Sequence, residues 1–421
     1  MTQAACKVLP ADKAVLRELA QRYLDACNSP RNQECRRLWH KHDLCRGERP
    51  LILTEANEGV EMIIGEYRPG CQEQWARGRE REFLTHLAHF EVIGDDYPLE
   101  PFVDLAWQIT VSEYGVAFHH TSPETSGTRG AYHIDALITD LERDFDRLKP
   151  RTFTLDRAAS LEMKAALEDV YDGLLEVRMR HHPWWSLGMT WDAIRLVGLE
   201  GLMLAMYDQP KGLHRLMAFL RDDNVRLLEW LEQEQLLSLN NSSDYIGSGS
   251  RGYTTALPGR DATDHVRPAD MWVLLESQET VGVGPAQFEE FIFPYQDSLA
   301  QRFGRVYYGC CEPVHTRWHV VKKLANLKRV SVSPWCDEPF MAEALGNNCV
   351  YSRKAKPTLV STDRFDEELI RKDLRDTMLA TRKHGCTVEI IMKDVHTLRG
   401  QRDRLTRWTQ LARDVTAEVY R

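Results

Sequence analysis

The spacing of apolar residues changes along the chain from a helical period to short runs that are typical of strands. Near the start, apolar residues recur at helical spacing from Val15 to Leu24, and Asn28-Ser29-Pro30 predicts the end of that helix. We therefore expect residues 1–50 to form a helical extension or cap. Residues 51–421 are then expected to form one barrel domain.

Beyond residue 50, short apolar runs alternate with amphipathic segments, which is typical of parallel β/α units. We predict an α/β fold, a TIM (β/α)8 barrel preceded by the helical extension. One run is read as an excursion outside the barrel, Trp272–Leu275. The alternative is an open doubly wound sheet, although no nucleotide fingerprint follows the first strand. The runs are Leu51–Thr54, Leu105–Val111, Leu174–Met179, Leu236–Leu239, Trp272–Leu275, Val306–Tyr308, Val330–Val332, Cys349–Tyr351 and Val388–Met392.

Composition supports a large apolar core, because 43% of the 421 residues are hydrophobic. Charged residues make up 28% and the formal net charge is -9, so a general nucleic-acid binder is excluded. No uninterrupted apolar stretch has the ~18 residues of a membrane span, and the first residues lack a signal-peptide pattern. We expect a cytoplasmic protein whose ten cysteines are mostly reduced thiols.

The most specific local feature is the adjacent pair Cys310 and Cys311, which follows a predicted strand. Alternation along the strand lets only one of the two thiols face the mouth of the barrel. A thiolate there, joined by His396 or by an acid from another strand, predicts a zinc site with an open position. The alternative is a pair of thiols packed at a strand end.

Carboxylates follow two further strands, where active sites of β/α barrels lie. We predict Glu276, Glu279 and Asp394 as catalytic acid/base groups, with an exposed turn and a helix-capping loop as the alternatives. Polar or basic residues at other strand ends are predicted to bind substrate, and for the Asn pair ordinary turn chemistry is the alternative. They are Asn240, Asn241, Arg353 and Lys393.

Two loops complete the candidates. His181 and Trp184 lie in a His-His-Pro-Trp-Trp segment that predicts an aromatic wall for a flat ligand, with core packing as the alternative. The segment from Gly247 to Gly252 matches G-x-G-x-x-G, but no helix pattern follows it. We therefore reject dinucleotide binding and expect a flexible loop over the barrel mouth.

Several segments together resemble the uroporphyrinogen-decarboxylase superfamily, and in particular the corrinoid-dependent (cobalamin-dependent) methyltransferase-like branch of anaerobic bacteria. The resemblance runs from about Leu16 to the C-terminus and is strongest after residue 236. It implies a TIM barrel that either decarboxylates a tetrapyrrole or transfers methyl groups with zinc and a corrinoid. The segments begin at Leu236 (LLSLNN), Glu276 (ESQETVGV), Phe288 (FEEF), Pro294 (PY), Tyr308 (YGCCEP), Val330 (VSVSPW), Tyr351 (YSRK) and Ile391 (IMKD).

The first strand separates the two chemistries. Decarboxylases of the superfamily carry an arginine-rich segment there, whereas this chain has Glu55 and Glu58, which would repel a polycarboxylate. The resemblance therefore implies a methyltransferase that moves a methyl group from a small donor, such as a methoxylated aromatic compound, to a corrinoid protein. Its zinc ligands would come from Cys310, Cys311, Glu312 and His396, although the His-x-Cys pattern of the branch is matched only in part.

The sequence leaves alternatives open for the function and for the assembly. A tetrapyrrole lyase and a non-catalytic barrel that binds a small molecule are the alternative functions. A homodimer is an open alternative for the assembly. No nucleic-acid or membrane partner is expected.

Overall fold

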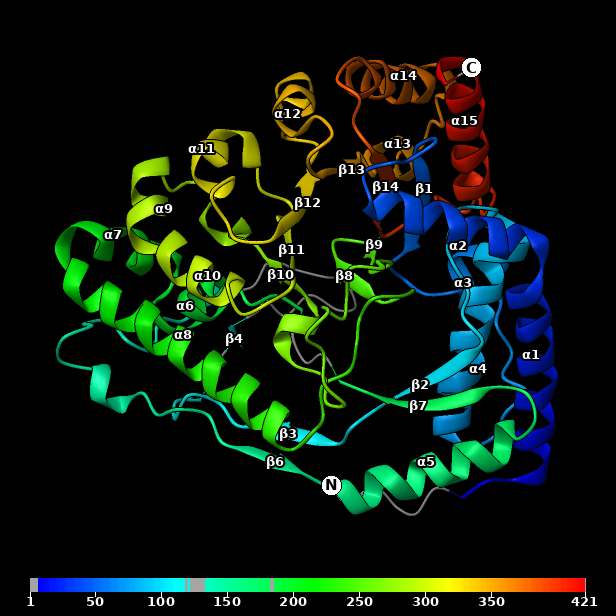
Figure 1. The fold of residues 1–421 in the computed structure, drawn as a ribbon, viewed down its shortest axis with the longest axis horizontal. Coiled ribbons are helices and arrows are strands. Elements are labelled where there is room, and N and C mark those ends of the chain that lie inside the picture. Colours follow the sequence, from blue (N-terminus) through cyan, green and yellow to red (C-terminus); the bar gives the residue numbers. More distant parts are fainter. Residues whose placement is uncertain (1–6, 118–119, 122–132, 182–184, 421) are drawn as a thin grey trace.

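A parallel sheet of six strands forms the centre of the structure, in the order β1, β14, β13, β12, β11, β10 (Figure 1). The structure is a computed structural model that describes residues 7–117, 120–121, 133–181 and 185–420. Smaller two-stranded sheets join β2 to β7 in parallel, and β3 to β6, β4 to β5 and β8 to β9 in antiparallel fashion.

The elements follow in chain order. The strands are β1 Leu51–Ala56, β2 Phe102–Ala106, β3 Ile109–Val111, β4 His120–Thr121, β5 His133–Ile134, β6 Phe153–Leu155, β7 Glu176–Arg180, β8 Tyr245–Gly247, β9 Ser250–Arg251, β10 Trp272–Leu275, β11 Arg305–Tyr308, β12 Leu327–Val332, β13 Val350–Ala355 and β14 Val388–Val395. The α-helices are α1 Pro10–Asn28, α2 Pro30–Asp43, α3 Glu61–Ile64, α4 Gln74–Ala88, α5 Arg157–Tyr171, α6 Thr190–Val197, α7 Leu199–Asp208, α8 Pro210–Gln233, α9 Pro285–Phe291, α10 Phe293–Ala300, α11 Trp318–Val321, α12 Glu338–Leu345, α13 Thr358–Ser361, α14 Glu367–Lys383 and α15 Arg404–Val419.

Local chemistry explains where these elements begin. Every residue of β10 and of β11 is buried, as expected for parallel strands that are covered on both faces. The side chains of Asp337 and Asp366 cap α12 and α14, because their carboxylates accept the N–H groups of Phe340 and Leu369. The expected opening helix is confirmed as α1, and the short runs near β1, β11, β12, β13 and β14 are confirmed as strands.

The predicted closed ring of eight strands is wrong for the hydrogen-bonded strands among the described residues, because the six-stranded sheet has two free edges. At the β1 edge, side chains take the place of a neighbouring strand. The carboxylate of Asp96 accepts the N–H of Ile52 at 2.8 Å, and Asp95 accepts the N–H of Thr54 at 3.0 Å. These carboxylates satisfy the edge donors that would otherwise pair with a strand.

At the opposite edge of the sheet, a side chain again bonds to the backbone groups of the edge strand. Trp272–Leu275, predicted to be an excursion, forms the edge strand β10 and pairs with β11. Its outer side meets Asn240, whose amide oxygen accepts the N–H of Trp272 at 2.8 Å and whose amide nitrogen donates to the Trp272 carbonyl at 3.0 Å. The predicted strand Leu236–Leu239 therefore lies beside β7 and β10 without being a strand in the structure. The architecture is a half-barrel.

The glycine-rich segment is not a flexible loop over the mouth, because it forms the β8–β9 hairpin packed against the sheet (Figure 1). Ser248, at its tip, is fully buried. A Cβ atom at Gly247 would lie 2.7 Å from the Tyr307 ring, and one at Gly249 would lie 2.8 Å from Ile391. The glycines therefore allow close approach to the sheet rather than phosphate binding, and no helix follows them.

The two N-terminal helices contact different parts of the molecule. Helix α1 packs with α4, α5, β2 and β7 around a second apolar cluster that includes Leu16 and Phe83. Helix α2 instead brings His42 and Asp43 to the start of the sheet strands. The division at residue 50 stays a prediction. No helix among the described residues is both long enough and apolar enough to cross a membrane.

Candidate functional site

A column of buried polar side chains runs along the inner face of the sheet. At its lower end, Glu389 accepts from Ser352 and lies 3.1 Å from His42. Above them, the Lys354 ammonium donates to Ser352 Oγ at 2.6 Å and to the Tyr307 hydroxyl at 2.9 Å. The column leads towards the carboxyl ends of the strands, where chemistry is expected in β/α folds.

Strand β14 bulges where this column ends. Thr54 pairs with Met392 and Ala56 pairs with Val395, so Lys393 and Asp394 together lie opposite Glu55. Asp394 has a positive φ of 58°, which an aspartate tolerates better than most residues. A bulge redirects side chains and is common beside active sites. Here it leaves the Asp394 side chain 45% exposed, with one carboxylate oxygen 3.5 Å from Lys393 Nζ.

The two adjacent thiols lie beside Lys393. Cys310 is buried and Cys311 is exposed, and their Sγ atoms lie 3.6 Å apart. The hydrogen bond from Cys310, which outweighs the opposing effect of burial, lowers the pKa of Cys311, and the Lys393 ammonium adds to this effect. The same hydrogen bond raises the pKa of Cys310, so Cys310 remains the protonated partner. Cys311 is thus the more nucleophilic thiol.

A second cluster contains three carboxyl groups. Glu312 is buried, and its oxygens accept the N–H groups of Ser277 at 2.9 Å and of Cys310 at 2.8 Å. Burial, together with Glu279 and Glu312, raises the pKa of Glu276 well above its usual range. Burial raises the pKa of Glu312 as well, but its two backbone donors oppose this effect, whereas Glu276 has one, the N–H of Gln278. Glu276 is therefore the carboxyl group of this pair that holds a proton more tightly. Glu279 accepts the hydroxyl of Thr190 at 2.7 Å.

The predicted zinc ligands do not converge. His396 Nδ1 lies 2.8 Å from a carboxylate oxygen of Glu58, at the exposed end of β14. Glu312 already uses both oxygens on backbone donors. Within the part of the chain that the structure describes, no group of three or more His, Cys, Asp or Glu side chains is arranged to hold a metal ion. These residues do not fit a zinc ion.

The side chains of Asn240 and Asn241, predicted to bind substrate, form hydrogen bonds to backbone groups instead. The Asn240 amide joins β10 as described, and the Asn241 amide donates to the carbonyl of Leu257 at 2.7 Å. The backbone N–H of His181 donates to Ser238 Oγ at 3.0 Å. Trp184 lies outside the described residues.

The strand-end cations also differ from expectation. Arg353 points to the helices on the outer face, where it pairs with Glu338 at 3.1 Å and Asp373 at 2.7 Å. Its neighbour Lys354 points inward, because successive strand residues alternate between faces. Lys354, which joins the buried polar column, is not among the residues predicted from the sequence to bind substrate. For Lys354 the signal was present, since it shares the face of Ser352 on β13.

Comparisons with known proteins give little beyond this geometry. No family model matches the sequence, and no curated protein sequence matches it. Among solved structures, a methyltransferase from Methanosarcina mazei is similar in fold, with 11% identity and a TM-score of 0.48. The match covers 90% of this chain and 97% of that chain. A likeness this low carries no argument about function.

Proposed function

We propose that the chain is a methyltransferase that takes a methyl group from a small O-methylated compound, such as a methoxylated aromatic, and transfers it to a corrinoid held by a partner protein. The sequence segments that resemble the methyltransferase branch support this proposal. The structural observation that carries it is the buried Glu276 beside Glu279 and Glu312 at the carboxyl end of β10, where burial raises the pKa of its carboxyl group.

Removal of a methyl group from oxygen is aided by an acid when the leaving oxygen is basic. The methyl carbon forms a bond to the incoming nucleophile while its bond to oxygen breaks, and the electron pair of that bond stays on oxygen. The carboxyl proton of Glu276 passes to this oxygen, so the product leaves as a neutral alcohol or phenol. General acid catalysis of this kind contributes ~10²–10⁴-fold in rate. Glu276 then regains a proton from solvent.

The neighbouring groups have supporting roles in this proposal. Burial of Glu276, with the neighbouring Glu279 and Glu312, favours its protonated form. Lys393, beside the bulge, attracts a donor that carries a carboxylate or phenolate. Asp394, on the same bulge, is exposed and remains a predicted acid/base group.

The involvement of a corrinoid is inferred from the sequence resemblance alone, and the corrinoid would supply the nucleophile that accepts the methyl group. It would be presented by the partner at the carboxyl ends of the strands. Zinc is not part of the proposed step.

The test is methyl transfer to cob(I)alamin under anaerobic conditions, with a series of aryl methyl ethers whose phenols differ in acidity. We expect Glu276→Gln to lower kcat by ~10²-fold or more for the least acidic phenols, and much less for acidic ones, which need no proton. Glu343→Gln, on the exposed face of α12, is the matched control. No turnover by the unaltered protein, or an equal loss across the series, would contradict the proposal.

A further inference from the structure

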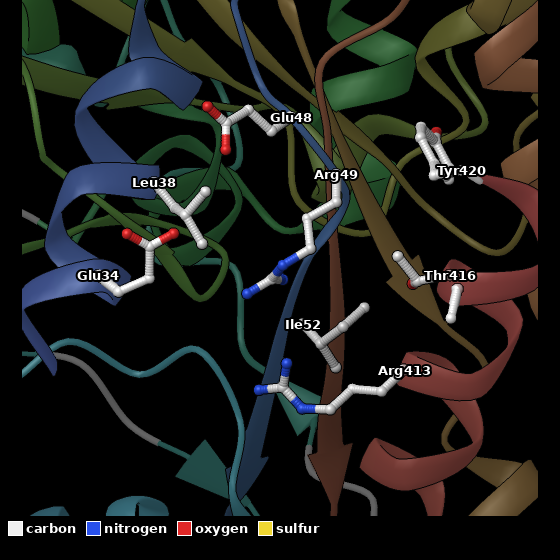
Figure 2. Close-up of a pocket in the computed structure, with 9 residues that line it drawn as sticks. Glu34, Leu38, Glu48, Arg49, Ile52, Arg413, Thr416 and Tyr420 are labelled. Carbon is white, nitrogen blue, oxygen red and sulfur yellow. The ribbon is translucent and has the colours of Figure 1, made fainter. Parts of the chain in front are cut away.

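A cleft of about 480 Å³ lies between α2, the start of β1 and α15 (Figure 2). Arg49 lines it just before β1 begins, so the cleft is at the amino ends of the strands. The candidate functional site is at their carboxyl ends. The volume is within the range of small-ligand sites, which is ~300–1,000 Å³.

Two arginines in the cleft share one buried carboxylate. Arg49 contacts both oxygens of Asp96 at 2.8 Å, and Arg413 Nη2 donates to Asp96 Oδ1 at 3.2 Å. The Asp96 side chain is 4% exposed, whereas those of Arg49 and Arg413 are 28% and 31% exposed. Two positive charges thus face one negative charge, which leaves one positive charge uncompensated within this trio.

The guanidinium groups keep donors for a ligand. Figure 2 shows them turned towards one another between α2 and α15. Among the described residues, Arg49 Nε and Arg413 Nη1 have no hydrogen-bond acceptor, and neither atom is buried. Two donors from a pair of guanidinium groups suit the oxygens of one anion.

The remaining walls limit the charge and size of that anion. Glu34 and Glu48 also line the cleft, and their charges are balanced because both pair with Arg37 and Glu48 also pairs with Lys41. The single uncompensated charge of the trio therefore matches a ligand with one negative charge. Ala417 and Tyr420 add accessible apolar surface to the cleft, whereas Leu38 and Ile52 beneath it are buried. We propose that this cleft binds a small organic monocarboxylate, with its carboxylate on Arg49 and Arg413 and its apolar body against Ala417 and Tyr420.

Calorimetric titration of the full chain with isobutyrate at low ionic strength tests the proposal. Isobutyramide, an uncharged analogue of similar shape, and inorganic phosphate are the comparison ligands. We expect isobutyrate to bind, the amide not to bind, and phosphate to bind more weakly. Arg413→Gln should weaken binding by about tenfold or more, because a charge-assisted hydrogen bond is lost. Arg375→Gln, which removes a surface arginine paired with Glu418, should leave binding unchanged.

A second variant keeps the ion network intact. Ala417→Trp fills the cleft from α15 without changing its charge, and we expect it to abolish binding while the protein unfolds at an unchanged urea concentration. The proposal is overturned if isobutyrate does not bind the unaltered protein, or if the amide or phosphate binds at least as tightly. Unchanged binding by Ala417→Trp would also overturn it.

Discussion

The Sγ atoms of Cys310 and Cys311 lie 3.6 Å apart, although one side chain is buried and the other is exposed. Strand β11 ends at Tyr308, and Gly309 follows with a φ of 95°. Both thiols come after this turn, and the Lys393 ammonium acts on both of them. The pair therefore behaves as one donor and one acceptor rather than as two equivalent thiols.

The first prediction concerns the reactivity of Cys311. Iodoacetamide at neutral pH should modify Cys311 several-fold faster than the partly buried Cys45 and Cys336, because burial raises the pKa of both of those thiols. Mass spectrometry of peptides over time gives the rates. Cys310→Ala should slow modification of Cys311, since its hydrogen-bond donor is lost, whereas Cys27→Ala should not. Equal rates for Cys311 and Cys45 would contradict the asymmetry.

A second prediction is a pH dependence of stability from Lys354. Burial lowers the pKa of Lys354 from 10.5 to about 8. Between these pH values the unfolded chain holds the proton and the folded protein does not, so stability rises with pH there. Relative to Lys354→Met, the unaltered protein should gain up to about 3 kcal/mol over this interval. Urea unfolding at pH 7.5 and pH 10 measures the difference, and substitution of the exposed Lys383 at the end of α14, Lys383→Met, is the control. A constant difference would contradict the prediction.

A third prediction concerns Glu389 at the base of the polar column. Its carboxylate lies 3.1 Å from His42 and 3.6 Å from Arg329, and all three side chains are fully buried. Glu389→Gln should lower the free energy of unfolding by ~3–5 kcal/mol at pH 7. It removes one of the two buried carboxylates that pair with Arg329 and leaves Asp43 shared between Arg329 and Arg305.

The pH dependence of this effect has a defined sign. Burial alone would raise the pKa of Glu389, but the hydrogen bond from His42 and the charge of Arg329 outweigh burial and lower this pKa. Its stabilising contribution is therefore complete above the unfolded pKa of ~4.3 and is lost as the pH falls towards the folded pKa. The difference in free energy of unfolding between the unaltered protein and Glu389→Gln, measured by urea unfolding, should narrow below pH ~4. Glu343→Gln should show no such gap, and an equal effect of both substitutions would contradict this account.

A fourth prediction compares two glycines. A Cβ atom at Gly188 would lie 2.1 Å from the carbonyl oxygen of Glu276, whereas one at Gly78 in α4 would meet nothing within 4 Å. Gly188→Ala should destabilise the protein by ~1–3 kcal/mol or more and displace Glu276, while Gly78→Ala should stabilise it by ~0.5–1 kcal/mol. Thermal unfolding measures both, and methyl transfer reports on Glu276. Unaltered stability of Gly188→Ala would contradict the close approach.

The sequence by itself determined most of the elements. Apolar periodicity located α1 and α14, and continuous apolar runs located strands such as β11 and β14. The spacing of apolar residues along a segment reflects which of its faces are buried. The rejection of nucleotide binding at Gly247 also followed from local order, since no helix pattern came next.

Only the tertiary structure decided how the sheet ends and which side chains meet. Asp96 and Asn240 satisfy the sheet edges through contacts between segments far apart in the chain, which no local pattern encodes. The orientation of β13 in the sheet places Lys354 on its inner face and Arg353 on the outer face that the helices cover. The His396 side chain contacts Glu58 rather than the cysteines. These outcomes depend on register and on competition among long-range partners, and both are fixed only when the strands pack together.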